Sequence, residues 1–201
     1  MTTAPETLTT NETEELLKVI ATVEMAEWSK WKRKRNTLIA LLMLDAGLRV
    51  GEVAKLRISH LIFGSEPVRA IALNKTIAEK GCKRTVPLTE RTIAAIKDFM
   101  PFIYQIGLEC PENYVFFAND SRRHITTRQI ERMIGFFSLM AFGRWVHPHV
   151  LRHTFATNLM RITSTPTVQQ LLGHKHLTST QVYTHPNQDD CEKAIKNLQI
   201  S

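Results

Sequence analysis

The segment Leu42-Met-Leu-Asp-Ala-Gly-Leu-Arg-Val-Gly-Glu-Val-Ala-Lys-Leu56 joins two helical patterns through a glycine-rich turn. Apolar residues recur at helical spacing up to about residue 46, with Asn36 as the expected N-cap and Gly47 as the expected C-terminal stop. A second, short helix is expected over residues 51–56. The segment therefore predicts a tight turn between two helices, and it places Arg49 within that turn.

Three strands are predicted downstream of this turn, where the helical spacing gives way to short β-type runs. They cover residues 58–63, 68–73 and 83–88, and a polar hairpin tip with Lys75, Lys80 and Gly81 joins the last two. Helices are predicted over residues 10–23, 89–106, 126–137, 148–161, 165–172 and 189–199. We therefore expect an α+β fold that is mostly helical, with a small three-stranded antiparallel sheet early in the chain.

Composition indicates one globular domain in a reducing compartment. The chain has 201 residues, of which 43% are apolar and 22% charged, and no apolar run is long enough to span a membrane. The N-terminus shows no signal peptide, and Cys82, Cys110 and Cys191 form no disulfide framework, which favours the cytoplasm. Within a single domain over residues 1–201, we expect an N-terminal helix and basic lead-in over 1–30 and a tail helix over 187–201.

An excess of positive charge indicates a polyanionic partner. The formal net charge is +7, from 26 basic and 19 acidic residues. The run Trp28-Ser-Lys-Trp-Lys-Arg-Lys-Arg35 is typical of a solvated helix face or of a backbone contact to DNA, and its place before the helices around Arg49 favours the second interpretation. The residues predicted to contact DNA are Lys30, Lys32, Arg33, Lys34, Arg35, Lys83, Arg122 and Arg123.

Arginine, histidine, lysine and tyrosine recur in four separate segments with chemistry that suits a phosphodiester. Two arginines, Arg49 and Arg152, could each bind a non-bridging phosphate oxygen, and the helix N-terminus at His149 favours the same anion. A tyrosine such as Tyr183 is a weak nucleophile that surrounding cations can activate. Lys80, at the hairpin tip, could protonate the expelled sugar oxygen. This chemistry needs neither a metal nor another cofactor.

Two ordinary interpretations compete with this one. Histidines near an arginine on one helix are more often a satisfied polar face than a site. The cluster His147, His149 and His153 could also suggest zinc, but no carboxylate or cysteine stands at ligand spacing beside it. We therefore expect no metal site.

Four motifs decide between these interpretations, because the sequence resembles the catalytic domain of tyrosine recombinases, the phage integrase family. They are Ala-Gly-Leu-Arg-Val-Gly-Glu-Val (46–53), Glu-Lys-Gly-Cys-Lys-Arg-Thr-Val-Pro-Leu (79–88), His-Pro-His-Val-Leu-Arg-His-Thr-Phe-Ala-Thr (147–157) and Leu-Leu-Gly-His-Lys-His-Leu-Thr-Ser-Thr-Gln-Val-Tyr-Thr-His (171–185). They follow one another in family order, across about three quarters of the chain. In length the chain is similar to the fimbrial phase-variation invertases.

The resemblance implies a role for each motif residue. It implies that the two arginines clamp the scissile phosphate, that a hairpin lysine is the general acid, and that the tyrosine is the nucleophile. It also implies that one histidine assists proton transfer, that another binds a phosphate oxygen, and that Glu52 fixes the site, whereas His153 is structural. The catalytic positions are Arg49, Lys80, His149, Arg152, His174 and Tyr183, with Lys83 as an alternative to Lys80.

The resemblance further implies a site-specific DNA recombinase, of integrase or invertase type, that works through a covalent 3′-phosphotyrosyl intermediate. The implied partners are double-stranded DNA with paired inverted-repeat half-sites, further copies of the chain in a tetramer, and accessory DNA-bending proteins, without a membrane. The N-terminal core-binding domain of typical members is expected to be absent. Two alternatives remain: a DNA-binding regulator that no longer cleaves, and a nicking-closing enzyme like the type IB topoisomerases.

Overall fold

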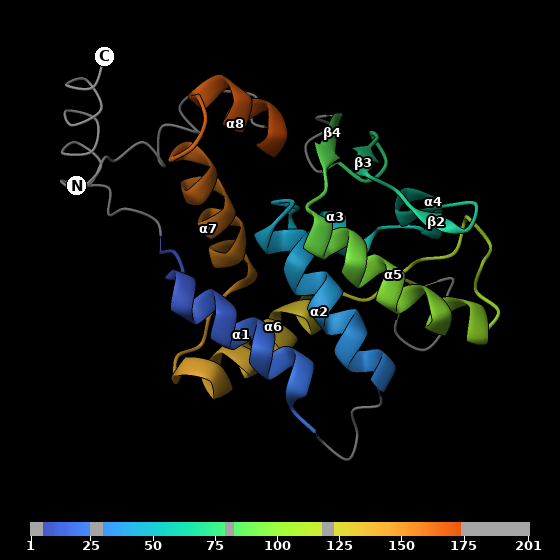
Figure 1. Cartoon of the computed structure of the whole chain (residues 1–201), viewed down its shortest axis with the longest axis horizontal. Coiled ribbons are helices and arrows are strands. Elements are labelled where there is room, and N and C mark those ends of the chain that lie inside the picture. Colours follow the sequence, from blue (N-terminus) through green and yellow to red (C-terminus); the bar gives the residue numbers. More distant parts are fainter. Residues whose placement is uncertain (1–5, 25–29, 79–82, 118–122, 174–201) are drawn as a thin grey trace.

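Helices make up most of the computed structural model, which describes residues 6–24, 30–78, 83–117 and 123–173 (Figure 1). Helix α1 (Thr10–Thr22) begins with a capping box between Thr9 and Glu12. Helix α2 (Lys30–Leu44) packs against α1, against α5 (Glu90–Gln105) and against α7 (Pro148–Met160). Helix α6 (Thr127–Phe142) packs against α1 and α7, and the short α8 (Thr165–Leu172) packs against α7. The mostly helical α+β fold expected from the sequence is confirmed.

Local signals account for several helix ends. The hydroxyl of Thr89 caps α5, and the side chains of Thr126 and Gln129 form the predicted capping box at the start of α6. Pro148 stands in the first turn of α7. Gly173 ends α8 in the left-handed region, with φ of 65°. These predictions are confirmed because each depends on residues that are close in sequence.

The start of α2 differs from the prediction. The helix begins at Lys30, so Asn36, the expected cap, lies inside it and is fully buried. Lysine and arginine favour helix, and Trp31 in the first turn stacks on Phe117 with ring centroids 6.1 Å apart. This tertiary contact extends the helix through the basic run.

The predicted three-stranded sheet is wrong in detail, because the described residues form two separate two-stranded sheets. Residues expected to begin the first strand form a helical turn, α4 (Ile58–Leu61), in which the His60 Nδ1 accepts the backbone N–H of Arg57 at 3.1 Å. Strands β1 (Ile62–Phe63) and β2 (Glu66–Pro67) then form one antiparallel pair. Strands β3 (Ala70–Leu73) and β4 (Arg84–Pro87) form the other. Only the second pair belongs to the predicted hairpin.

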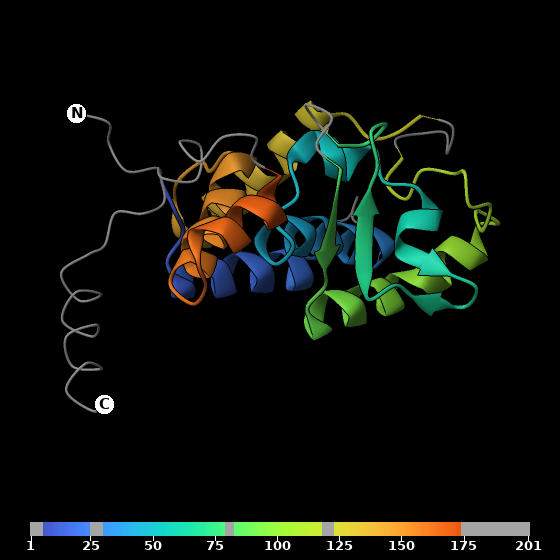
Figure 2. The ribbon, with the colours of Figure 1, turned by 90° about the horizontal axis from the view of Figure 1, so that it is seen from above.

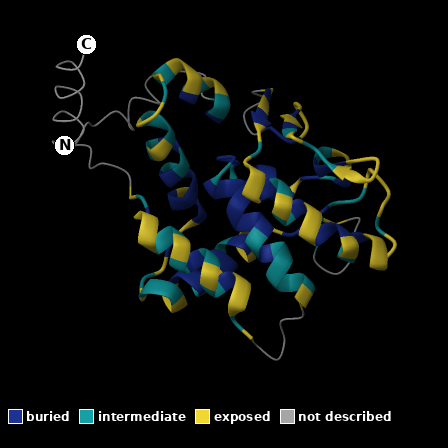
Figure 3. Ribbon diagram, viewed as in Figure 1, coloured by how far each residue is buried: buried dark blue, intermediate teal, exposed yellow. Residues whose placement is uncertain are grey.

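The main hydrophobic core surrounds the C-terminal part of α2, which is dark blue at the centre of Figure 3. A second, smaller cluster holds α8 against α7 through Ala156, Val168 and Leu172. Figure 2 shows β4 between β3 and α8, and it shows α3 (Val50–Ala54) on the opposite side of the molecule from α1 and α5. Among the described helices, none combines the length and the apolar character that crossing a bilayer requires. Because the apolar contact of α8 is small, its C-terminal end depends on polar contacts.

Candidate functional site

The turn before α3 fixes the backbone of Arg49. Gly47 has φ of 59°, a conformation that favours glycine, and Arg49 is the N-cap of α3. The Arg49 backbone N–H donates to Glu52 Oε2 at 2.9 Å, and its Nη1 lies 3.3 Å from Glu52 Oε1. The Arg49 side chain is 13% exposed. The Arg49 side chain therefore lies at the edge of the core, mostly but not fully buried.

Glu52 is a buried carboxylate shared by two arginines. Arg84 of β4 donates from Nη1 and Nη2 to its two oxygens, at 2.8 Å and 2.6 Å. The Glu52 side chain has no exposed surface, and that of Arg84 is 2% exposed. Burial alone would raise the pKa of Glu52, but the hydrogen bonds and charge of Arg84, and then of Arg49, lower it below its usual value. Glu52 is thus ionised at neutral pH.

Arg152 ties α7 to the turn and to the end of α8. Its Nη1 donates to the carbonyl oxygen of Gly47, and its Nη2 donates to that of Leu172 at 2.8 Å. Arg152 is 4% exposed. Arg84 Nε donates to the preceding carbonyl, that of Leu171, at 2.9 Å. Two guanidinium groups therefore hold the last carbonyls of α8, which a helix leaves without intrahelical partners.

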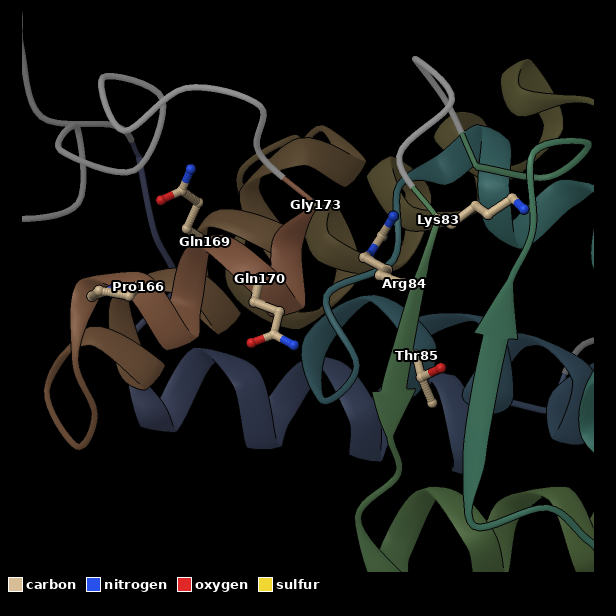
Figure 4. Close-up of a pocket in the computed structure, with 7 residues that line it drawn as sticks. All are labelled: Lys83, Arg84, Thr85, Pro166, Gln169, Gln170 and Gly173. Atoms are coloured by element: carbon tan, nitrogen blue, oxygen red, sulfur yellow. The ribbon is translucent and has the colours of Figure 1, made fainter.

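These contacts form a closed ring that joins four elements. The ring runs from Arg152 to the Gly47 turn, through Arg49 and Glu52 to Arg84, and back to Arg152 through the end of α8. Figure 4 shows the Arg84 side chain extending from β4 toward α8. The ring thereby joins the predicted residues Arg49 and Arg152, which are more than 100 positions apart in the sequence. It contains three arginines and one carboxylate, so its net charge is positive.

A cavity of about 400 Å³ lies beside the ring, between β4 and α8 (Figure 4). Polar side chains of β4 and α8 line most of it, and Lys83 extends away from α8 in this view. Its lining residues are Lys83, Arg84, Thr85, Pro166, Gln169, Gln170 and Gly173.

The histidines of the third motif stack at the start of α7. His147 is the N-cap, and its Nδ1 accepts the backbone N–H of His149 at 3.5 Å. Their rings are 5.1 Å apart, and His147 Nε2 lies 3.6 Å from Glu131 Oε1. His149 is exposed, whereas burial, with the charges of His149 and Arg152, lowers the pKa of the half-buried His153. His147 and His149 are both exposed, so a ligand can reach either of them, whereas His153 is half-buried.

The predicted basic run does not form one exposed surface. Lys30 is exposed, but Lys34 forms an ion pair with Asp98 of α5. The Arg35 guanidinium lies 5.0 Å from the Trp31 ring, and burial lowers its pKa to about 10. Lys32 and Arg33 are half-buried, whereas Lys83 and Arg123 are exposed. Contact of these residues with DNA stays a prediction.

Several predicted residues fall outside the described part of the chain. They are Lys80, Arg122, His174 and Tyr183. The residue that the sequence analysis missed is Arg84. Its signal was the alternation of β4, in which Arg84 and Val86 point inward and Thr85 outward. An arginine on the buried face of a strand implies a buried acidic partner.

Replacing Gly47 with alanine tests the turn. A Cβ there would lie 2.3 Å from Phe155 Cδ1, and the positive φ adds backbone strain. We expect Gly47→Ala to lower the free energy of unfolding by at least about 2 kcal/mol, measured by chemical denaturation.

Gly64→Ala is the matched control, because Gly64 has φ of 60° and nothing within 4 Å of the added Cβ. It isolates the backbone strain from the clash with Phe155. Equal losses of stability in the two variants would show that this clash is relieved without cost.

Comparison with known proteins gives consistent matches. The profile of the phage integrase family matches residues 6–190. A tyrosine recombinase of Pseudothermotoga lettingae is 34% identical over 170 residues, which are 83% of this chain and 55% of that protein. Tyrosine recombinase XerC of Bacillus pumilus is 34% identical over 187 residues, 90% of this chain and 58% of its own. The chain thus spans between half and two thirds of the length of these relatives.

Solved structures agree with these sequence matches. The crystal structure of XerA recombinase superposes with a TM-score of 0.76 at 28% identity, covering 98% of this chain and 65% of that one. XerH recombinase, solved in a pre-cleavage complex bound to its difH substrate, matches with a TM-score of 0.73 at 24% identity, over 96% of this chain and 54% of that one. The second match supports the fold alone.

Proposed function

Because the chain belongs to the phage integrase family, we propose that it is a site-specific DNA recombinase that breaks and rejoins strands through a covalent 3′-phosphotyrosyl intermediate. The observation that supports this proposal is the ring of contacts, in which Arg49 binds the buried Glu52 and Arg152 binds the Gly47 carbonyl of the turn before Arg49. Two arginines at one site suit the non-bridging oxygens of one phosphodiester.

In the proposed reaction, Tyr183 loses its phenolic proton to a base, and its Oη attacks phosphorus. The new bond from phosphorus to the Tyr183 oxygen forms as the bond to the sugar 5′-oxygen breaks, and that oxygen takes a proton from Lys80. Strand joining reverses these steps with a 5′-hydroxyl from a second strand. The number of phosphodiester bonds is conserved, so the exchange needs no nucleotide hydrolysis.

The described residues have distinct parts in this reaction. Arg49 and Arg152 stabilise the negative charge that grows on the phosphate in the transition state. His149, exposed at the N-terminus of α7, assists proton transfer, and the helix dipole there favours the same anion. His174 would bind a further phosphate oxygen. Lys83 is the alternative to Lys80 as the acid.

Double-stranded DNA is the proposed substrate. The net charge of +7 supports it, and the matched structures include XerH bound to difH substrate and the Tn1549 transposon integrase in complex with transposon right end DNA. We further propose paired inverted-repeat half-sites, a tetramer of this chain on DNA, and accessory DNA-bending proteins. These partners, like the reducing cytoplasmic compartment, stay predictions.

A nicked suicide substrate tests the proposal. It would be built from the repeats that flank the chain's own gene, and the reaction would be run in EDTA. Loss of the short nicked fragment traps the intermediate, so we expect a covalent protein–DNA band on a denaturing gel. Arg49, Arg152 and Lys80 supply the cations, so EDTA should leave the yield unchanged.

Three other results would contradict the proposal. DNA shifts without adducts would indicate a regulator that no longer cleaves. Relaxation of any supercoiled DNA without recombinant products would indicate a nicking-closing enzyme. A strict need for a divalent metal in the cleavage step would overturn the proposed mechanism.

A further inference from the structure

Arg84 stands where three elements of the site meet. From β4 it donates two hydrogen bonds to Glu52 of α3 and one to the Leu171 carbonyl of α8. Among the described residues, the buried apolar residues of α8 belong to the small cluster with α7. Arg84 and Arg152 therefore both fix the C-terminal end of α8 against the rest of the site.

The distances indicate which arginine neutralises Glu52. The Arg84 contacts measure 2.8 Å and 2.6 Å in a bidentate arrangement, whereas the Arg49 guanidinium is 3.3 Å from the carboxylate. Bidentate guanidinium–carboxylate pairs are the stronger class, above all when desolvated. Glu52 therefore pairs more strongly with Arg84 than with Arg49, and the two guanidinium groups with this single carboxylate keep one net positive charge.

Removing Arg84 alone would leave Glu52 to pair with Arg49. A buried carboxylate without its main partner is costly, so Glu52 would draw the Arg49 guanidinium into a tight pair. The charge of Arg49 would then be compensated within the protein rather than by a phosphate.

We propose that Arg84 is a positioning residue of the reaction: it balances Glu52 so that Arg49 can bind the scissile phosphate. This inference rests on the proposed recombinase function. Arg84 itself is not expected to contact DNA, because the Arg84 side chain is only 2% exposed. Its effect on the reaction passes through Glu52 and Arg49.

The test compares Arg84→Met with the double variant Glu52→Gln/Arg84→Met. In single-turnover cleavage of the suicide substrate, we expect Arg84→Met to be slower than the wild type by about 100-fold, since a small misplacement of a clamping group costs that much. The double variant removes the competing carboxylate, and Gln can still accept the Arg49 backbone N–H. We expect its cleavage rate to recover to within about 10-fold of the wild type.

Arg69→Met is the matched control, because Arg69 forms an ion pair with Glu90 in which both side chains are more than four fifths exposed. It should cleave at the wild-type rate. Gel shifts should show similar DNA affinity for all variants, so that the loss is in the rate and not in binding. Thermal unfolding identifies any variant that is not folded, and the double variant lacks the unpaired buried charge that would unfold the single one.

Two results would overturn the positioning role. One is an Arg84→Met variant that is folded and cleaves as fast as the wild type. The other is a folded double variant that is no faster than a slow Arg84→Met, because a purely structural role gives no rescue by removal of Glu52. A wild-type chain that forms no adduct would instead contradict the proposed function, so the two failures are distinguishable.

Discussion

Tyr183→Phe is expected to abolish covalent protein–DNA adducts while DNA binding persists. The substitution removes only the phenolic oxygen, which is the atom that forms the bond to phosphorus in the proposed reaction. Phenylalanine retains the ring, so the fold and the DNA contacts should be unchanged. Adducts on the suicide substrate would be measured on denaturing gels, and affinity on native gels.

The other two tyrosines of the chain provide the controls. Tyr104 lies near the C-terminal end of α5 and is 40% exposed. Tyr114 is held between Arg57, 5.0 Å from its ring, and His124, 5.2 Å away edge to face. Tyr104→Phe and Tyr114→Phe should cleave normally. Adducts from Tyr183→Phe, or their loss in either control, would mean that Tyr183 is not the nucleophile.

Features that depend on neighbouring residues could be predicted from the sequence. The capping hydroxyls of Thr89 and Thr126, the Pro148 start of α7 and the Gly47 and Gly173 stops act within a few residues of themselves. Their effect is the same in almost any tertiary context, because they act on the backbone N–H and C=O groups that a helix end leaves without intrahelical partners.

Features that depend on distant contacts could not be predicted. The start of α2 is set by the stacking of Trp31 on Phe117, 86 positions later in the chain, and not by Asn36. The first predicted strand is instead α4 and the short β1, which pairs with β2. Short apolar runs fit either structure, and the neighbours decide between them.

The residues of the site could be predicted from the sequence, but the hydrogen bonds and ion pairs that connect them could not. The motifs predicted Arg49, Glu52 and Arg152, and the structure brings all three into one ring. They did not predict that Arg84, 32 positions from Glu52, would be the main partner of that carboxylate. Pairing across that distance depends on where β4 packs, which local patterns do not encode.

The last prediction concerns the two arginines themselves. Arg49→Lys and Arg152→Lys keep the charge but replace a planar fork with a single ammonium. Each should lower the single-turnover cleavage rate by about 10²–10³-fold, the usual cost of one transition-state contact. Arg152→Lys should also lower stability, because a single ammonium is a poor replacement for the two guanidinium nitrogens that bind the Gly47 and Leu172 carbonyls.

The structure therefore predicts an asymmetry between the two variants. Arg49 is 13% exposed and is held by its backbone N–H as well as its side chain, so Arg49→Lys should lose rate with little loss of stability. Arg69→Lys, at an exposed position, is the control and should change neither. Cleavage assays and denaturation curves on the same preparations measure both effects. Near-normal cleavage in both site variants would contradict the phosphate clamp. Equal stability losses would contradict the structural role given to Arg152, because its bonds to the Gly47 and Leu172 carbonyls are what distinguish it from Arg49.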